Sequence, residues 1–231
     1  RRKSELAVLQ SQINPHFLYN TLESITWMIE GNRNQDAVCM ISELAPLFRI
    51  SLSRGKTIIR IEDELQHCRN YMNIQKYRYK ERFVTEYDVS EEIYPFCTVK
   101  LILQPILENA IYYGVGDMDE DDHPRILVRG FKKEEEIYLV VSDNGMGMRR
   151  EDVENILTDN QKVPKHGSGV GLINVHTRIQ LMFGVRYGLK VESEPDEGTT
   201  VTIHLPAIPY TKENCEILEA PGKPPRNEVE P

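Results

Sequence analysis

Residues 12–20 read Gln12-Ile-Asn-Pro-His-Phe-Leu-Tyr-Asn20, and the organisation of the chain follows from this short segment. On a helix with about 100° per residue, His16 and Asn20 share one face, one turn apart. Pro15 removes a backbone donor just before His16 and should loosen the helix there. A neutral imidazole on an outward face can act as a nucleophile. On this segment alone, a surface histidine beside a proline is an equally good interpretation.

The same segment begins a predicted helical hairpin. The main apolar stripe of its first helix lies on the face opposite His16 and contains Leu18, Leu22, Ile25 and Ile29. A polar turn over residues 31–36 follows, with Asp36 as N-cap of the second helix. That helix carries an apolar stripe of Ile41, Leu44, Leu47 and Phe48, and Pro46 should kink it. A lone hairpin cannot bury both of its sides, so pairing with a second copy as a four-helix bundle is predicted.

A mixed α/β region follows the hairpin. Helical spacing of apolar residues predicts a helix over residues 61–80 and two further helices over residues 99–113 and 170–183. Alternating apolar residues predict strands over 83–89, 125–131, 136–142, 187–194 and 199–205. Residues 144–169 form a long polar stretch that is typical of a functional lid. From residue 207 onward, prolines and acidic residues predict a disordered tail.

The composition excludes several classes of function. The 231 residues include 28 basic and 36 acidic side chains, giving a formal net charge of −8, whereas a nucleic-acid binder normally has a basic face. No stretch approaches the roughly 18 apolar residues of a membrane span, so we expect no membrane contact by this part of the protein. Four cysteines without metal spacing predict free thiols in a reducing compartment, namely Cys39, Cys68, Cys97 and Cys215. The start Arg-Arg-Lys, without Met, suggests a piece of a longer protein.

A second segment, Leu103-Gln-Pro-Ile-Leu-Glu-Asn-Ala-Ile-Tyr-Tyr-Gly114, places two polar residues inside an apolar helix. Glu108 and Asn109 are suited to a hydrated Mg²⁺ that bridges phosphates, because Mg²⁺ keeps waters and takes few protein ligands. The alternative is that both side chains lie on a solvent face.

Two glycine-containing segments complete the pattern. Asp143-Asn-Gly-Met-Gly147 ends a strand, where a carboxylate can accept a hydrogen bond from an exocyclic amine such as that of adenine. Gly167-Ser-Gly-Val-Gly-Leu172 leads into a helix, which is a suitable arrangement for an anion. Taken singly, the segment at residues 143–147 is also an ordinary turn signal, and the segment at residues 167–172 is only weak evidence for an anion site.

In this order, the segments resemble those of bacterial sensor histidine kinases of the LytS/YesM type over residues 4–206. The resemblance implies an α+β chain with a helical hairpin over residues 1–60 that forms a dimeric four-helix bundle. A Bergerat-type (GHKL) α/β sandwich that binds ATP is implied over residues 61–206, before the predicted tail over residues 207–231. The implied activity is ATP-dependent autophosphorylation and phosphoryl transfer to an aspartate of a response regulator, by a homodimer on the cytoplasmic side of the membrane that holds the parent protein.

The resemblance also implies roles for single residues. His16 would be the phosphoacceptor, Asn109 would bind Mg²⁺, and Glu108 would orient the imidazole or accept its proton. Asn20 would position water for the reverse, phosphatase reaction. Asp143 would recognise adenine. The glycines around it and in the second loop would shape the adenine pocket and wrap the triphosphate, namely Gly145, Gly147, Gly167, Gly169 and Gly171. Thr199 or Thr200 would support the adenine contact, and the choice between them stays open.

Residues 103–110, Leu-Gln-Pro-Ile-Leu-Glu-Asn-Ala, resemble the N box of this family, and the chain departs from the family pattern directly after it. The family usually has Lys-His-Gly at the position where this chain has Tyr112-Tyr113-Gly114. Losing the lysine should weaken ATP binding, or leave Lys165 or His166 of the predicted lid to substitute for it. This departure favours an alternative function, a degenerate dimeric scaffold that binds nucleotide without autophosphorylation.

Overall fold

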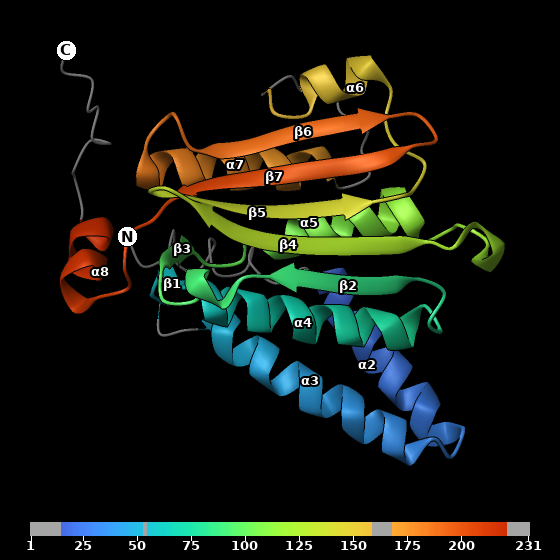
Figure 1. Cartoon of the computed structure of the whole chain (residues 1–231). Coiled ribbons are helices and arrows are strands. Elements are labelled where there is room, and N and C mark those ends of the chain that lie inside the picture. The colour runs from blue at the N-terminus through green and yellow to red at the C-terminus, as the bar shows by residue number, and fades with distance from the viewer. Residues whose placement is uncertain (1–14, 53–54, 159–167, 221–231) are drawn as a thin grey trace, which may run out of the picture.

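The protein is described by a computed structural model that covers residues 15–52, 55–158 and 168–220. A helical hairpin packs beside a sandwich of one five-stranded sheet and a layer of helices (Figure 1). The fold is α+β, as the sequence predicts.

The hairpin consists of α2 (Pro15–Glu30) and α3 (Asn34–Leu52). Its turn is shorter than predicted, because α3 begins before Asp36. The prediction of Asp36 as N-cap is therefore wrong: it lies in the first turn of α3, where Arg33 Nε donates to its carboxylate over 2.7 Å. The helix continues through Pro46.

The buried face of α2 is not the predicted stripe. Phe17, Thr21, Ile25 and Met28 are buried, whereas 47% of Leu22 and 53% of Ile29 are exposed. In α3, Ala37, Met40, Leu44 and Leu47 are buried, and half of Ile41 is exposed. This buried face packs on the next helix of the same chain, so the hairpin already covers one of its two apolar sides without a second copy.

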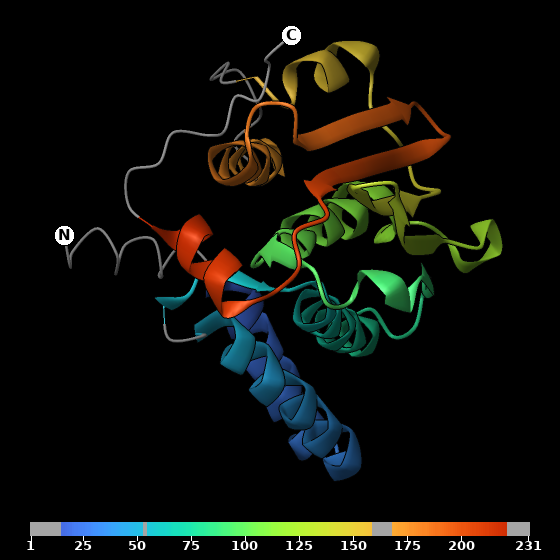
Figure 2. The same ribbon diagram turned by 60° about the vertical axis from the view of Figure 1, so that its left-hand side comes forward.

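That next helix, α4 (Ile61–Arg78), follows the short strand β1 (Ile58–Arg60). The helix predicted over residues 61–80 is confirmed, and Ile61, Leu65, Cys68 and Met72, which recur at helical spacing, are buried in the core. A second stripe is also buried, with Glu64, His67, Tyr71 and Ile74. A helix buried on two sides lies between two layers, and α4 lies between the hairpin and the rest of the sandwich (Figure 2).

The main sheet has the order β2-β4-β5-β7-β6, in which β2 and β4 are parallel and the other pairs antiparallel. The strands are β2 (Val84–Val89), β4 (Arg125–Lys133), β5 (Glu136–Asp143), β6 (Gly188–Glu194) and β7 (Gly198–Pro206). The five predicted strands are confirmed within two residues at each end.

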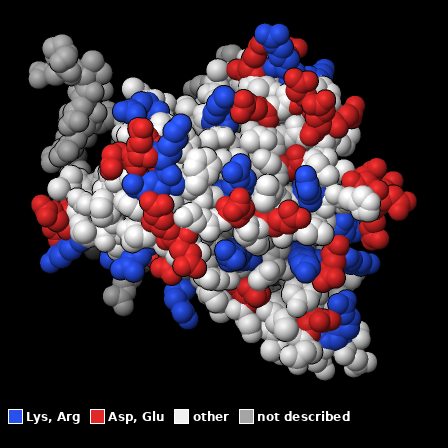
Figure 3. All heavy atoms as spheres, viewed as in Figure 1, with Lys and Arg blue, Asp and Glu red and all other residues white. Residues whose placement is uncertain are grey.

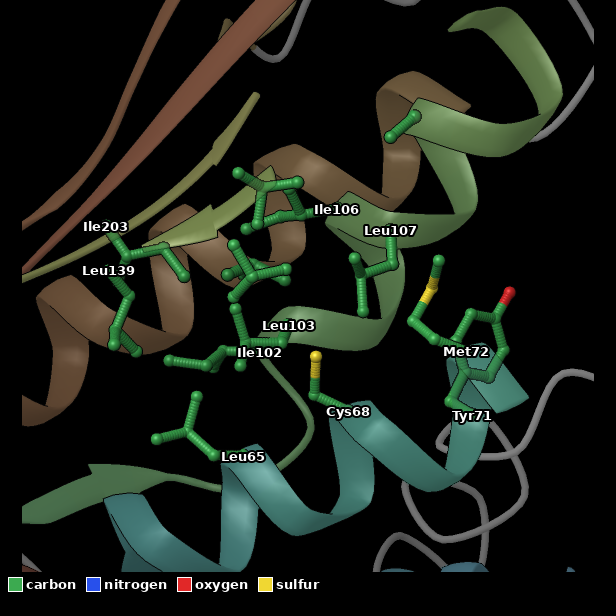
Figure 4. Packing of buried hydrophobic residues seen from close by; sticks show 14 of the residues in the cluster. Leu65, Cys68, Tyr71, Met72, Ile102, Leu103, Ile106, Leu107, Leu139 and Ile203 are labelled. Atoms are coloured by element: carbon green, nitrogen blue, oxygen red, sulfur yellow. The ribbon is translucent and has the colours of Figure 1, made fainter. Parts of the chain in front are cut away.

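One face of the sheet is covered by α4, α5 (Leu103–Asn109) and α7 (Ser168–Phe183) (Figure 2). The core between them is apolar, with Leu65 and Cys68 of α4 facing Ile102, Leu103 and Ile106 (Figure 4). The face seen in Figure 3 carries acidic and basic side chains interspersed, as a solvent-facing surface does. Short helices lie in the connections, namely η2 (Glu91–Ile93), η4 (Glu120–Asp122) and α6 (Arg150–Asn155).

The helix predicted over residues 99–113 is in fact three elements. The chain forms strand β3 (Cys97–Val99), which pairs antiparallel with β1, then α5, and then a π-helix, η3 (Ala110–Val115). Between β3 and α5, Leu101 has a φ of 58°, which a helix does not allow.

The prediction of a disordered tail is wrong for its first part. The chain adds a bridge between Phe96 and Pro209 and then forms α8 (Lys212–Glu219). Glu219 Oε1 accepts from the backbone N–H groups of Thr57 and Ile58 over 2.7 and 2.9 Å. The C-terminal helix is thus attached to the segment that joins the hairpin to the sandwich. Residues 221–231 lie outside the described residues.

Two further predictions concern the whole chain. All four cysteines are free, as predicted. Among the described residues, no helix has the length and apolarity needed to cross a membrane.

Candidate active site

The carboxylate of Asp143 lies at the end of β5, on the face of the sheet that the helices cover. Gly145 N–H donates to its Oδ1 over 2.9 Å. Burial raises the pKa of Asp143 to about 6, and the backbone N–H groups of Gly145 and Thr199 oppose this rise. Near neutral pH the group is therefore an ionised acceptor in a largely desolvated place, which suits recognition of an amine donor.

Close backbone approaches surround this carboxylate. A Cβ on Gly114 would lie 2.8 Å from Asp143 Oδ1, and one on Gly145 would lie 2.3 Å from the backbone of Gly114. Gly147 has a φ of 66°, and a Cβ there would lie 1.9 Å from Glu194 O. A larger residue at these positions would close the pocket or displace its walls.

The register of β5 and β7 distinguishes Thr199 from Thr200, the two candidates for supporting the adenine contact. Thr199 lies opposite Asp143, and Thr200 lies opposite Ser142. Because successive side chains point to opposite faces of a sheet, Thr199 shares the face of Asp143 and Thr200 does not. Thr200 Oγ1 instead lies 3.1 Å from Ser142 Oγ. Of the two threonines, the structure therefore leaves Thr199 as the candidate.

Ser193, on β6, is a pocket residue that the sequence reasoning missed. Its hydroxyl donates to Gly198 O over 2.9 Å, accepts from Met148 N–H over 2.8 Å, and lies 2.8 Å from Thr199 Oγ1. One side chain thus fixes both the glycine loop after β5 and the turn before β7. A serine inside an ordinary strand pattern gives no signal for this role.

The N-box residues lie at the end of α5. Glu108 and Asn109 are half-buried, and Gln104 Nε2 donates to Glu108 Oε1 over 3.1 Å. The π-helix that follows carries Tyr112 and Tyr113, each more than two-fifths exposed, and turns Gly114 toward Asp143. Single π-turns inside helices are frequent at functional sites.

The start of α5 is held from α4 by Glu64. This fully buried carboxylate accepts the backbone N–H groups of Leu101, Ile102 and Leu103 over 2.8, 2.8 and 3.0 Å. Burial raises the pKa of Glu64, while the three amides and Arg178 oppose the rise. Arg178 of α7 in turn donates to the carbonyl of Lys100 over 2.6 Å. The sequence did not predict this role, because Glu64 is one of three acidic residues in the first turn of α4 and such residues are usually exposed.

The second glycine segment is more helical than predicted. Gly167 lies outside the described residues, and α7 begins at Ser168, so Gly169 and Gly171 lie in its first turn rather than in a loop. A Cβ on Gly171 would lie 3.4 Å from Pro105 Cβ of α5, which is ordinary contact. Gly171 of α7 and Pro105 of α5 are therefore adjacent, which brings the first turns of the two helices together.

The predicted pair on the hairpin is confirmed as a contact. His16 is exposed near the start of α2, and Asn20 Nδ2 lies 2.8 Å from His16 Nδ1. An amide NH₂ only donates, so Nδ1 accepts and the proton of the neutral ring lies on Nε2.

The described residues hold no group of three or more His, Cys, Asp or Glu side chains suited to a metal. A Mg²⁺ that arrives with ATP does not need one, since phosphates and waters supply most of its ligands. The half-buried amide of Asn109, beside the carboxylate of Glu108, fits such an ion.

These features together define a nucleotide-binding α/β sandwich joined to a hairpin with an exposed histidine. A family model described as histidine kinase matches residues 4–83, and one described as histidine kinase-, DNA gyrase B- and HSP90-like ATPase matches residues 98–209. The chain belongs to the sensor histidine kinase family.

Curated relatives agree with this assignment. The sensor histidine kinase YesM of Bacillus subtilis is 38% identical over 205 residues, which are 89% of this chain and 34% of YesM. The sensor histidine kinase BtsS of Escherichia coli is 31% identical over 204 residues, which are 88% of this chain and 34% of BtsS. The sensor protein LytS of Streptococcus mutans is 30% identical over 210 residues, 88% of this chain and 34% of LytS. The chain thus spans about a third of the length of these relatives.

Among solved structures, the mycobacterial sensor histidine kinase MprB has a TM-score of 0.50 at 18% identity and covers 66% of this chain and 97% of its own. This likeness shows the fold of the sandwich. The relatives are titled as sensor kinases or sensor proteins, and they give no support to a scaffold without autokinase activity.

Proposed function

We propose that this chain is the kinase core of a sensor histidine kinase and transfers the γ-phosphoryl group of ATP to His16. The proposal rests on the presence of two features in the same chain. A desolvated carboxylate, Asp143, stands among close-packed glycines beside the N box, and an exposed His16 stands on a hairpin that packs on the same sandwich.

In the proposed binding mode, Asp143 accepts the exocyclic amine of adenine, and Thr199 supports that contact through water. Gly145 and Gly147 let the backbone approach the base. The triphosphate extends toward the beginning of α7, where Gly169 and Gly171 lie and where backbone N–H groups favour an anion. Gly167 is proposed for the same role by family resemblance.

Asn109 would hold the Mg²⁺, which neutralises charge on the phosphates. In the proposed step, the unprotonated ring nitrogen of His16, which carries the lone pair, attacks the γ-phosphorus. A nitrogen–phosphorus bond forms, the bond to the βγ-bridging oxygen breaks to release ADP, and the proton on the other ring nitrogen passes to Glu108. Positioning and charge neutralisation supply most of the rate in such transfers.

The phosphoryl group would then pass to an aspartate of a response regulator that docks on the hairpin. Asn20, in contact with His16, would position water for the reverse dephosphorylation of that regulator. Replacing Asn20 and finding regulator dephosphorylation unchanged would disprove this role.

We also propose a homodimer that forms through the hairpin. The support is the exposed apolar side that the sandwich leaves uncovered, which includes Tyr19, Leu22, Ile29, Val38 and Ile41. A second hairpin would bury this side in a four-helix bundle. For the longer parent protein we propose a place in the cell membrane, with this part on the cytoplasmic side, on the strength of the resemblance to sensor kinases.

The test is incubation with γ-labelled Mg-ATP beside a His16→Ala variant. Acid-labile, base-stable label on the unaltered protein and none on the variant is the expected result. A matched control is His123→Asn, which removes another exposed histidine, one that adopts a left-handed conformation that Asn tolerates. Equal label on His16→Ala, or ATP binding without label on the unaltered dimer, would contradict the proposal.

A further inference from the structure

The residue that follows the phosphoacceptor is anchored on the sandwich of its own chain. Only 1% of Phe17 is exposed, and its ring centroid lies 5.0 Å from that of Tyr71 on α4, at an interplanar angle of 41°. His16 itself remains exposed. The neighbouring Cα atoms of His16 and Phe17 are about 3.8 Å apart, so this aromatic contact fixes the position of the His16 backbone on the sandwich.

Tyr71 connects this anchor to the N box. It extends from α4 on the side of α5, as does Met72 (Figure 4). Burial raises the pKa of the Tyr71 hydroxyl, and the charge of Glu108 raises it further. Gln75 Nε2, one turn further along α4, donates to the Tyr71 hydroxyl over 2.7 Å and so restrains the position of the ring.

The anchored face of α2 differs from its dimerisation face. Taking His16 as zero on a helix of about 100° per residue, the buried Phe17, Thr21, Ile25 and Met28 lie between about 100° and 180°. The exposed Leu22 and Ile29 lie at about 240° and 220°, and Tyr19 at about 300°. A second chain can therefore cover the exposed side while Phe17 stays on the Tyr71 of its own chain.

We infer that each chain of the dimer phosphorylates its own His16, and that Tyr71 is the positioning residue that docks Phe17 for this reaction. The inference rests on the proposed autokinase function. It assigns the attacking histidine and the ATP site to the same chain. It also gives Tyr71 of α4 a role in phosphoryl transfer rather than in nucleotide binding.

The first experiment uses mixed dimers with tags of different size, purified through both tags. One chain carries His16→Ala and the other Asn109→Ala, so that an intact histidine and an intact N box are on different chains. The inference expects no label on either chain. The control dimer of unaltered chain and His16→Ala should carry label on the unaltered chain. Label on the Asn109→Ala chain would overturn the inference and leave the proposed function standing, whereas an unlabelled control dimer would overturn both.

The second experiment tests Tyr71 through separate kinetic constants. Misplacement of a reacting group can cost about a hundredfold in rate, so we expect Tyr71→Ala to lower the kcat of autophosphorylation at least about tenfold with an unchanged KM for ATP. Tyr71→Phe keeps the ring and should restore the rate. Phe17→Leu tests the same contact from the hairpin with a smaller loss of volume, and it should lower kcat alone.

A purely structural role of Tyr71 would instead raise the KM for ATP and lower the ATP-induced rise in melting temperature together with kcat. A faster reaction in Tyr71→Ala or Phe17→Leu would mean that the contact holds the kinase inactive. Either result would overturn the positioning role.

Discussion

Gly114 and Asp143 come so close that a Cβ on Gly114 would lie 2.8 Å from one carboxylate oxygen of Asp143 and 3.2 Å from the other. The π-helix after the N box brings this glycine against the end of β5. The segment after the N box and the first glycine segment are therefore in direct contact.

Gly114→Ala should weaken ATP binding. Overpacking costs about 1–3 kcal/mol, so we expect the affinity measured by calorimetry to fall at least about fivefold. Gly55→Asn is the control, because the Cβ position of Gly55 is open and Asn tolerates its φ of 76°. An unchanged affinity in Gly114→Ala would show that Asp143 does not face the nucleotide.

The affinity for ATP should depend on the ionisation of Asp143. Its pKa of about 6 exceeds the usual value, because burial disfavours the charged form. The carboxylate is the acceptor, so binding should be full above pH 6 and fall about tenfold per unit below it. Calorimetry from pH 5 to pH 8 measures this. Asp143→Asn, which does not titrate, corrects for the titration of ATP itself and should bind weakly at every pH.

The same raised pKa makes a prediction for the nucleotide-free protein. A carboxyl with a raised pKa in the folded state destabilises the fold once the pH exceeds its unfolded value, and this cost is complete above about pH 6. Asp143→Asn should therefore raise the melting temperature at pH 7.5 more than at pH 4. An equal effect at both values would contradict the desolvated state of Asp143.

The two threonines of β7 should differ. Thr199→Val removes a hydroxyl on the pocket face and should lower ATP affinity about fivefold, as expected for one hydrogen bond of about 1 kcal/mol. Thr200→Val, the same change one residue along, should leave the affinity within error. The reverse order would show that the β5–β7 register is shifted.

Glu64 should matter for stability. Glu64→Ala leaves three buried N–H groups without an acceptor, and each costs about 1–3 kcal/mol, so the free energy of unfolding should fall by at least about 3 kcal/mol. Glu62→Ala, an exposed carboxylate in the same helical turn, should change it by less than about 0.5 kcal/mol. Urea unfolding of both variants measures the difference, and similar values would contradict the capping role.

The dimer should depend on the exposed side of α2. A double variant Leu22→Glu, Ile29→Glu places charge in the proposed bundle core and should produce monomers by light scattering after gel filtration. Leu181→Glu changes a leucine on α7 that is 74% exposed, more than Leu22 or Ile29, and should leave the dimer intact. Dimers in the double variant would place the interface elsewhere.

Much of the sandwich could be predicted because its strands alternate strictly and its helix over residues 61–80 has an apolar stripe. The contact between His16 and Asn20 follows directly from four-residue spacing. The helix predicted over residues 99–113 failed for a long-range reason. Val99 pairs with Ile58, and Glu64 captures the N–H groups after it, and neither partner is visible in the local pattern.

The hairpin shows a second limit of pattern reasoning. Both sides of α2 are apolar, so periodicity could not tell which side packs on α4 and which stays exposed. The tail shows a third, because its prolines suggested disorder, whereas Thr211 accepts the N–H of Asn214 and begins a helix.

Glu219 accepts hydrogen bonds from Thr57, just before β1, and from Ile58, the first residue of β1, and β1 is the strand through which the hairpin continues into the sandwich. Segments near the two ends of the sequence are therefore mechanically linked at one joint. A displacement of the hairpin relative to the sandwich would therefore have to move or break the two hydrogen bonds of Glu219. The C-terminal helix is thus part of the joint between the two units.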